Sequence, residues 1–128
     1  SEIMEHVPDP KRFVQSLYAV LKPGGRLIIT TPYNEKIIYH LCVHCNRPTP
    51  ALAHIHSFNE NNIGALIPQG ATWHWSAFSN KYLSRLRSHI VLNFLGYGVW
   101  RFVDKIFNFL FGQPQRLMII IEKHKVAL

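Results

Sequence analysis

PDPKRFVQSLYAVLKPGGRLIITTP, residues 8–32, predicts a helix, a glycine turn and a buried strand in direct succession. Asp9 can accept a backbone N–H as the N-cap of this helix, and Pro10 suits its first position. Apolar side chains recur at spacings of three and four up to Leu21, and the KPGG turn ends the helix. The β-branched run over residues 26–32 is typical of a buried strand. A helix that leads into a strand through a glycine turn is the closing half of a β–α–β crossover, so we expect an α/β fold.

The rest of the chain predicts a less regular set of elements. Residues 33–50 are expected to be irregular, and a break between two helices is expected at Gly96 and Gly98. The continuous apolar centre of the final segment predicts a strand that is buried on both faces. In chain order, the expected elements are a short helix over 59–67, a strand over 71–79, helices over 81–111 and a last strand over 116–126.

The charge of the chain bounds its partners. The 128 residues contain 14 Lys and Arg against 7 Asp and Glu, which gives a formal net charge of +7. With 48% hydrophobic and 16% charged residues, we expect one folded domain and not a disordered chain. The positive charge favours anionic partners such as nucleotides, phosphorylated substrates or acidic membrane surfaces. The sequence contains no nucleic-acid-binding motif, so we expect no specific nucleic-acid partner.

The cysteines and the first residues indicate a cytoplasmic location. Cys42 and Cys45 are too close in sequence to form the framework of a secreted disulfide protein. The chain starts without the basic and apolar regions of a secretory signal. Residues 90–111 are apolar, but charged residues such as Arg101 and Asp104 interrupt them and make them a poor membrane span.

Glu2, Glu5 and His6 form an ExxEH pattern at the start of the chain. On one helical turn these side chains share a face, so two carboxylates and an imidazole can converge on one hard divalent cation such as Mg²⁺. The alternative is structural: the carboxylates favour a helix start, and His6 packs without a metal.

A second candidate metal site joins the segments CVHC and HIH. Cys42 and Cys45 form the CxxC half of a tetrahedral zinc site, and His54 with His56 would complete it. The alternative is a pair of reduced cysteines in a loop that form a labile disulfide in air.

Residues 1–32, SEIMEHVPDPKRFVQSLYAVLKPGGRLIITTP, resemble the second half of a class I S-adenosylmethionine-dependent methyltransferase, of the type that includes the ubiquinone-biosynthesis methyltransferases. In that family the acidic-histidine turn follows the fourth strand, and LKPGG leads into the fifth. HIHSFNENNIGALI (54–67) resembles the helix before strand six, and RLMIIIEKHK (116–125) the last strand. The resemblance implies an α/β fold that is the C-terminal half of a Rossmann-like sheet, strands four and five to seven with flanking helices. The chain would then be one partial domain over 1–128, with a turn, helix and fifth strand (1–32), a Cys/His-containing loop (33–58) and the remaining elements (59–128).

The family's glycine-rich cofactor loop, GxGxG, does not occur in these 128 residues. Such a loop lets the backbone approach the cofactor closely, whereas Gly24 and Gly25 precede a strand and Gly96 and Gly98 lie in an apolar helical context. We therefore expect either a fragment of a larger domain that is inactive alone, or a remnant whose exposed sheet edge is covered by a second copy in a homodimer.

The resemblance implies transfer of a methyl group from S-adenosylmethionine to a small-molecule acceptor, for which a hydroxyl group is the first candidate. Glu5 and His6 would be the catalytic residues near the substrate, and Ser1 and Glu2 would contact the cofactor.

The resemblance also bears on the ExxEH pattern. Some relatives hold Mg²⁺ or a similar ion with this pattern and one further histidine, which His54 or His56 would supply here. The ligand set that we predict is Glu2, Glu5, His6 and His56.

The alternative function belongs to another class: a non-catalytic homodimeric interaction module, stapled by zinc. The basic and aromatic segment over residues 81–111 likewise has two interpretations. It makes peripheral contact with a membrane surface, with Arg85, Arg87, Arg101 and Lys105 toward lipid phosphates, or it forms a cap or dimer helix over the substrate cleft.

Overall fold

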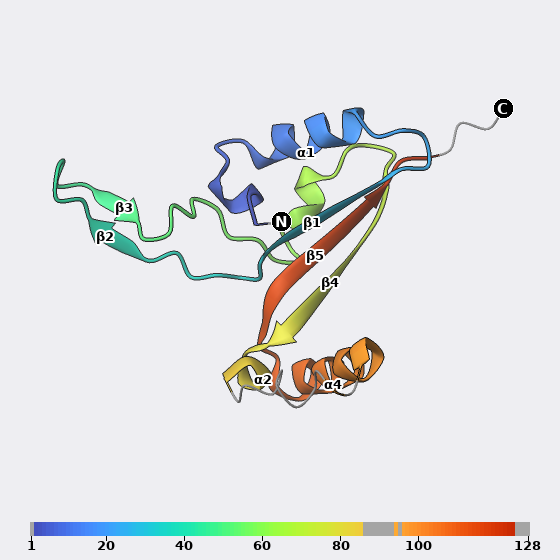
Figure 1. Ribbon diagram of the computed structural model, residues 1–128. Helices are drawn as coiled ribbons and strands as arrows, with labels where there is room; N and C mark the ends of the chain where they lie inside the picture. Colours follow the sequence, from blue (N-terminus) through green and yellow to red (C-terminus); the bar gives the residue numbers. More distant parts are fainter. Residues whose placement is uncertain (1, 86–93, 95, 125–128) are drawn as a thin grey trace.

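A three-stranded sheet forms the centre of the computed structural model, which describes residues 2–85, 94 and 96–124 (Figure 1). The central strand is antiparallel to both neighbours, so the two outer strands run in the same direction. Their carboxyl ends therefore meet the start of the central strand at one end of the sheet. In spatial order the strands are β1 (Arg26–Pro32), β5 (Pro114–Glu122) and β4 (Thr72–Asn80).

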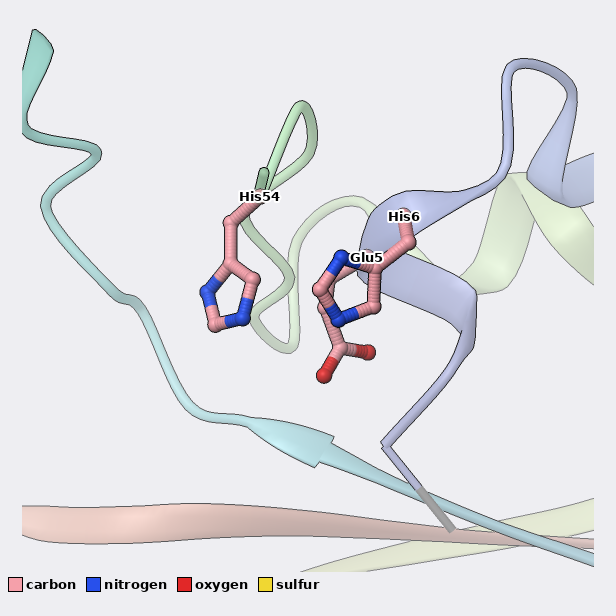
Figure 2. Close-up of side chains that lie close together, drawn as sticks. All are labelled: Glu5, His6 and His54. Atoms are coloured by element: carbon pink, nitrogen blue, oxygen red, sulfur yellow. The ribbon is translucent and has the colours of Figure 1, made fainter. Parts of the chain in front are cut away.

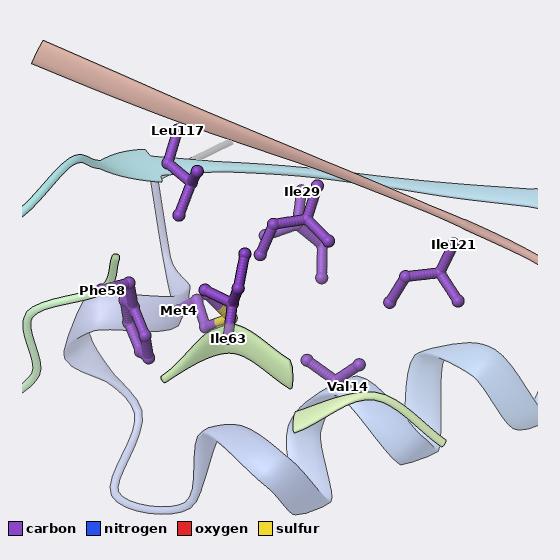
Figure 3. Packing of buried hydrophobic residues seen from close by; sticks show 8 residues of the cluster. Met4, Val14, Ile29, Phe58, Ile63, Leu117 and Ile121 are labelled. Carbon is purple, nitrogen blue, oxygen red and sulfur yellow. The ribbon is translucent and has the colours of Figure 1, made fainter. Parts of the chain in front are cut away.

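Three helical elements cover one face of this sheet (Figure 1). They are the 3-10 helix η1 (Met4–His6), the helix α1 (Pro10–Ala19) and the 3-10 helix η2 (Ile63–Leu66). The core between these elements and the sheet is formed by eight apolar side chains that are at most 4% exposed (Figure 3). They are Met4, Val14, Ile29, Phe58, Ile63, Leu117, Ile119 and Ile121.

Helix α1 has the start that the sequence predicts and an end that a distant residue completes. Asp9 Oδ1 accepts the backbone N–H of Arg12 at 2.9 Å, and Pro10 is the first helical residue. At the other end, Lys123 Nζ donates to the last carbonyl oxygens of the helix and the turn, those of Tyr18 at 3.3 Å, Ala19 at 2.9 Å and Leu21 at 2.8 Å. The last carbonyls of a helix lack partners within it, so this lysine stabilises the end of α1 by hydrogen bonding and by charge.

Several elements confirm the sequence predictions, and others differ. The α/β class, the first helix and the strands expected over 26–32, 71–79 and 116–126 are confirmed. The segment expected to be irregular contains a hairpin of β2 (Tyr39–Leu41) and β3 (Pro48–Pro50), two strands too short to show a periodic pattern. The helix expected over 59–67 is the single 3-10 turn η2.

The region expected to hold two helices contains α2 (Lys81–Arg85) and α4 (Gly96–Phe111). The predicted break is found at Gly96, where α4 begins with a backbone φ of 77° that favours glycine. The intervening part of the predicted helices, residues 86–93 and 95, lies outside the described residues. Both helices lie at the end of the sheet where β4 ends and β5 begins (Figure 1). None of the described helices is long and apolar enough to cross a membrane.

Among the described residues, no helix covers the opposite face of the sheet (Figure 1). Ile28 of β1 points to this face and is 56% exposed, and its partner Ile120 on β5 is only partly buried. The prediction that β5 is buried on both faces is therefore wrong for this chain: Leu117, Ile119 and Ile121 are buried, whereas Met118 and Ile120 are not. The described strands also leave the outer edge of β1 without a strand partner.

Lys123→Met provides a test of the cap on α1. We expect the free energy of unfolding to fall by about 1–2 kcal/mol, because the helix end loses its charged donor. Urea denaturation followed by circular dichroism measures this change. Lys22→Met, at an exposed lysine in the adjacent turn, is the control and should change the free energy by less than about 0.5 kcal/mol. Equal losses in the two variants would contradict the capping role.

Candidate functional site

Glu5, His6 and His54 converge on one point beside the sheet (Figure 2). Each offers one ligand atom, and these atoms all lie within 4.8 Å of one another. Glu5 and His6 come from η1, whereas His54 comes from the segment between β3 and η2. The Glu5 carbonyl holds that segment in place, because it accepts the backbone N–H of Ile55 at 2.9 Å and of His56 at 3.2 Å.

Glu5 is 1% exposed, and only one of its two carboxylate oxygens has a hydrogen-bond partner. Its Oε2 accepts a hydrogen bond from the Thr31 hydroxyl of β1 at 3.1 Å, and Thr31 is itself fully buried. Its Oε1 is buried and has no hydrogen-bond partner. Burying a carboxylate oxygen without a donor is unfavourable, so a proton donor or a cation beside this oxygen would stabilise the site.

The two histidines are both oriented by an acceptor at Nδ1. His6 Nδ1 lies 3.1 Å from the carbonyl oxygen of Ala53, and His54 Nδ1 lies 2.5 Å from Glu35 Oε2. Since a carbonyl and a carboxylate only accept, each Nδ1 must carry the proton, and each neutral ring keeps the Nε2 lone pair free. Metal-binding histidines in proteins are oriented in the same way.

The structure gathers only part of the predicted divalent-cation set. Glu2 lies before η1, which begins at Met4, and its carboxylate pairs with Arg116 of β5. The expected single helical turn therefore does not include Glu2. The ring of His56 lies 6.0 Å from that of Phe58, and its buried Nε2 has no partner. The histidine that the structure brings to Glu5 and His6 is His54, the other candidate beside His56, and Ser1 lies outside the described residues.

The predicted zinc set of Cys42, Cys45, His54 and His56 is not assembled. Among the residues that the structure describes, the group of Glu5, His6 and His54 is the one that converges. The reason is the hairpin of β2 and β3, which carries both cysteines at its tip while the histidines lie after its base (Figure 1). At this tip the backbone N–H groups of Cys45 and His44, and then the Cys45 thiol, donate to the Cys42 sulfur and lower the pKa of the Cys42 thiol.

A groove of about 850 Å³ lies beside the cluster, at the carboxyl end of β1. His54 belongs to both the groove and the cluster. Ligands of α/β sheets bind at the carboxyl ends of strands, so this groove is the candidate substrate site. Besides His54, its lining includes Glu2, Tyr33, Glu35, Lys81, Gln113 and Arg116.

With the site in place, comparisons with known proteins give the family. Residues 1–89 match a family model described as a methyltransferase domain. The chain belongs to this family of methyltransferases. The predicted resemblance to class I S-adenosylmethionine-dependent methyltransferases is thereby confirmed.

The similar curated proteins are ubiquinone biosynthesis O-methyltransferases. The mitochondrial protein of Rattus norvegicus is 30% identical over 109 residues, which cover 84% of this chain and 26% of the rat protein. That of Homo sapiens is 31% identical over 109 residues, 84% of this chain and 24% of the human protein. The protein of Coxiella burnetii is 50% identical over 30 residues, 23% of this chain and 13% of the bacterial protein. The methyltransferase chain thus spans about a quarter of the length of its rat and human relatives. No solved structure gives a significant match.

Three polar residues around the candidate site have no clear sequence signal. Glu35 orients His54 from a position 19 residues earlier in the chain. Tyr33 lines the groove and donates its hydroxyl to Glu60 Oε2 at 2.6 Å. This hydrogen bond, with burial and the nearby charge, raises the pKa of Tyr33 to about 12, so Tyr33 stays protonated at neutral pH and cannot serve as a base. None of these pairs follows a helix or strand period, which is why the sequence does not reveal them.

The lowered pKa of Cys42 gives a prediction for its reactivity. We expect iodoacetamide to alkylate Cys42 faster than Cys45 at pH 7, because the thiolate is the nucleophile. Mass spectrometry of timed digests measures both rates. Cys45 is the more exposed of the two, so exposure alone would predict the opposite order of rates. In a Cys45→Ser variant Cys42 should remain reactive, since two backbone donors are retained, and faster alkylation of Cys45 in the native chain would contradict the prediction.

Proposed function

We propose that this methyltransferase domain transfers the methyl group of S-adenosylmethionine to a hydroxyl group of a small molecule, and that Glu5 faces this acceptor. The observation that carries the proposal is the buried Oε1 of Glu5, which has no partner and belongs to a carboxyl group that converges with His6 and His54. An acceptor hydroxyl that donates to this oxygen would remove the cost of burying it. The similarity to proteins named O-methyltransferases supports oxygen as the atom that is methylated.

The proposed reaction requires alignment and a proton acceptor. The acceptor oxygen forms a bond to the methyl carbon while the carbon–sulfur bond breaks, and the sulfonium of the cofactor becomes a neutral thioether. The hydroxyl proton leaves to a base, and Glu5 Oε1 and the Nε2 atoms of His6 and His54 are the candidate acceptors. Because the methyl group is already activated in the cofactor, the main task of the chain is to hold the acceptor oxygen in line.

The same three side chains fit a divalent cation. One carboxylate and two imidazoles oriented through Nδ1 suit Mn²⁺ or Zn²⁺ better than Mg²⁺, which prefers oxygen ligands. A cation held by Glu5, His6 and His54 would orient the acceptor hydroxyl and lower its pKa. We therefore propose a first-row transition metal or zinc at this site instead of the predicted Mg²⁺. Its ligands would be Glu5, His6 and His54, with His54 in place of Glu2 and His56.

The groove supports a small-molecule substrate. Its volume of about 850 Å³ lies within the range of roughly 300–1,000 Å³ that is usual for small-molecule sites. Cationic and acidic side chains share its lining, so an acceptor with polar groups can bind in several orientations. His54, at the border of groove and cluster, would place one end of the substrate beside Glu5.

The unpaired edge of β1 and the uncovered sheet face support the proposal that further structure completes the cofactor site. Unpaired strand edges and exposed apolar faces are normally covered in folded proteins. A second copy of the chain or the remaining length of a longer protein would serve. Both alternatives agree with the absence of GxGxG from the 128 residues.

Calorimetric titration of the chain with Mn²⁺, and separately with Zn²⁺, tests the cluster. We expect Glu5→Gln to weaken binding at least about tenfold, because it removes the anionic ligand. Glu35→Gln should weaken it by a smaller factor, since it removes only the acceptor that orients His54. Circular dichroism would show whether each variant is folded.

Glu2→Gln is the matched control for this titration, because it removes a carboxylate three positions away that pairs with Arg116. It should leave the affinity unchanged within about twofold. Equal affinities of the native chain and Glu5→Gln, or an equal loss in Glu2→Gln, would sink the proposed ligand set.

Titration of the chain with S-adenosylmethionine tests whether the cofactor site is complete. We expect no saturable binding at micromolar concentrations, because the sequence lacks the glycine-rich loop. Saturable binding, together with a dimeric mass by light scattering, would instead show that two copies build the site.

A further inference from the structure

Helix α4 exposes a row of apolar side chains to solvent. Their exposed fractions run from 41% at Ile106 to 89% at Phe109. Because these residues recur at spacings of three and four, they lie along one face of the helix. We call this the outer face of α4; it consists of Val99, Phe102, Ile106, Phe109 and Leu110.

The opposite, inner side of α4 carries partly buried apolar side chains, such as Trp100 and Phe107, and is fixed to the end of β4 by two polar side chains. Asp104 is 1% exposed, and its carboxylate accepts the backbone N–H of Asn80 at 2.7 Å and of Ser79 at 3.0 Å. Asn108 donates to the same carboxylate at 3.1 Å and accepts from the Asn80 side chain at 2.8 Å. Surface helices of soluble domains usually direct their apolar residues inward, whereas α4 leaves its outer face exposed, and these hydrogen bonds hold it in that orientation.

The surroundings of the outer face are cationic. Asp104 is the only acidic residue in the sequence from 81 to 111, and its carboxylate is buried at the inner side. Lys105 is exposed at the flank of the outer face, and α2, which contacts α4, carries the exposed Lys81 and Arg85. An apolar face flanked by Lys105, with no exposed carboxylate on its own helix and with further cations on the neighbouring helix α2, is complementary to the surface of an anionic lipid bilayer.

We propose that the outer face of α4 docks onto an anionic membrane surface, with its apolar side chains in the headgroup and acyl boundary and its cations against lipid phosphates. The 16 residues of α4 measure about 24 Å, so the helix lies in the plane of the surface and does not cross it. This placement would cover the apolar side chains that α4 leaves exposed.

A second copy of the chain fits the outer face less well. Two copies would bring a formal charge of +7 against another +7. The outer face offers on the order of 500 Å² of apolar surface, below the roughly 800 Å² per partner of a stable protein interface. A lipid surface needs no such area, because its anionic headgroups add an attraction to each cation.

Docking would also bear on the groove. The groove begins directly after α4, at Gly112 and Gln113, so the docked helix brings this border of the groove to the lipid surface. This consequence rests on the proposed function, whereas docking itself does not.

Vesicle co-sedimentation of the full chain tests the proposal. We expect binding to phosphatidylcholine vesicles that contain about 30% phosphatidylserine, weaker binding to pure phosphatidylcholine, and a loss of affinity as the salt concentration rises. The double variant Phe102→Ser/Phe109→Ser should bind at least about tenfold more weakly to the anionic vesicles. Lys105→Gln should bind about fivefold more weakly to these vesicles and unchanged to neutral ones.

Leu41→Ser/Val43→Ser is the matched control, because it removes two exposed apolar side chains from the β2–β3 hairpin, away from α4. Its affinity for vesicles should equal that of the native chain.

Light scattering tests whether a second copy of the chain covers the outer face instead. A native dimer that the Phe102→Ser/Phe109→Ser variant converts to a monomer would identify the outer face as an interface between copies. That result, or no binding of the native chain to anionic vesicles at low salt, would overturn the proposal. Titrations with metal and with S-adenosylmethionine test the proposed ligand set and the cofactor site, so a negative result there does not bear on membrane docking.

Discussion

The pairing of β5 with both β1 and β4 is the interaction on which the rest of the structure depends. β5 is the last strand in the sequence but the central one in the sheet, and it pairs with a strand on each side. Its residues Leu117, Ile119 and Ile121 are at most 1% exposed and supply three of the eight core side chains. Without β5 the two parallel outer strands would have no shared neighbour, and the helices on the covered face would lose much of the surface that they pack against.

The same pairing positions the functional features. In the register of the sheet, Arg116 of β5 lies opposite Pro32 at the end of β1 and Phe78 near the end of β4. The groove lies at this end of the sheet, with Arg116 and Pro32 in its wall, and α4 is attached at the nearby end of β4. The cluster is attached through β1, because Thr31 donates to Glu5. One strand register therefore sets the distances among the candidate metal site, the groove and the helix that we propose to dock on lipid.

Most of the fold could be predicted from local sequence, because its signals act over a few residues. Asp9 and Pro10 mark the start of α1, and the β-branched runs mark β1 and β5. The site was predicted only in part. Glu5 and His6 were identified from their spacing, and the structure brings them together, whereas Glu2 precedes the single 3-10 turn η1 and pairs with Arg116. Of the candidates His54 and His56 the sequence prediction took His56, whereas the structure brings His54 to Glu5. Local sequence has no signal for this, because it depends on which ring turns toward Glu5 once the Glu5 carbonyl has bound the backbone of the later segment.

The sequence by itself determined the elements of this methyltransferase domain, its family and its positive charge, since capping, periodicity and composition are properties of neighbouring residues and of totals. The tertiary structure alone decided which side chains meet. It separated the cysteines at the hairpin tip from the histidines, paired Glu2 with Arg116, and left one Glu5 oxygen without a partner. It also fixed which side of α4 faces solvent, because the orientation of that helix follows from hydrogen bonds between Asp104 and the end of a strand 24 residues earlier. Such contacts join residues far apart in the chain, and only the packed sheet brings them within reach of one another.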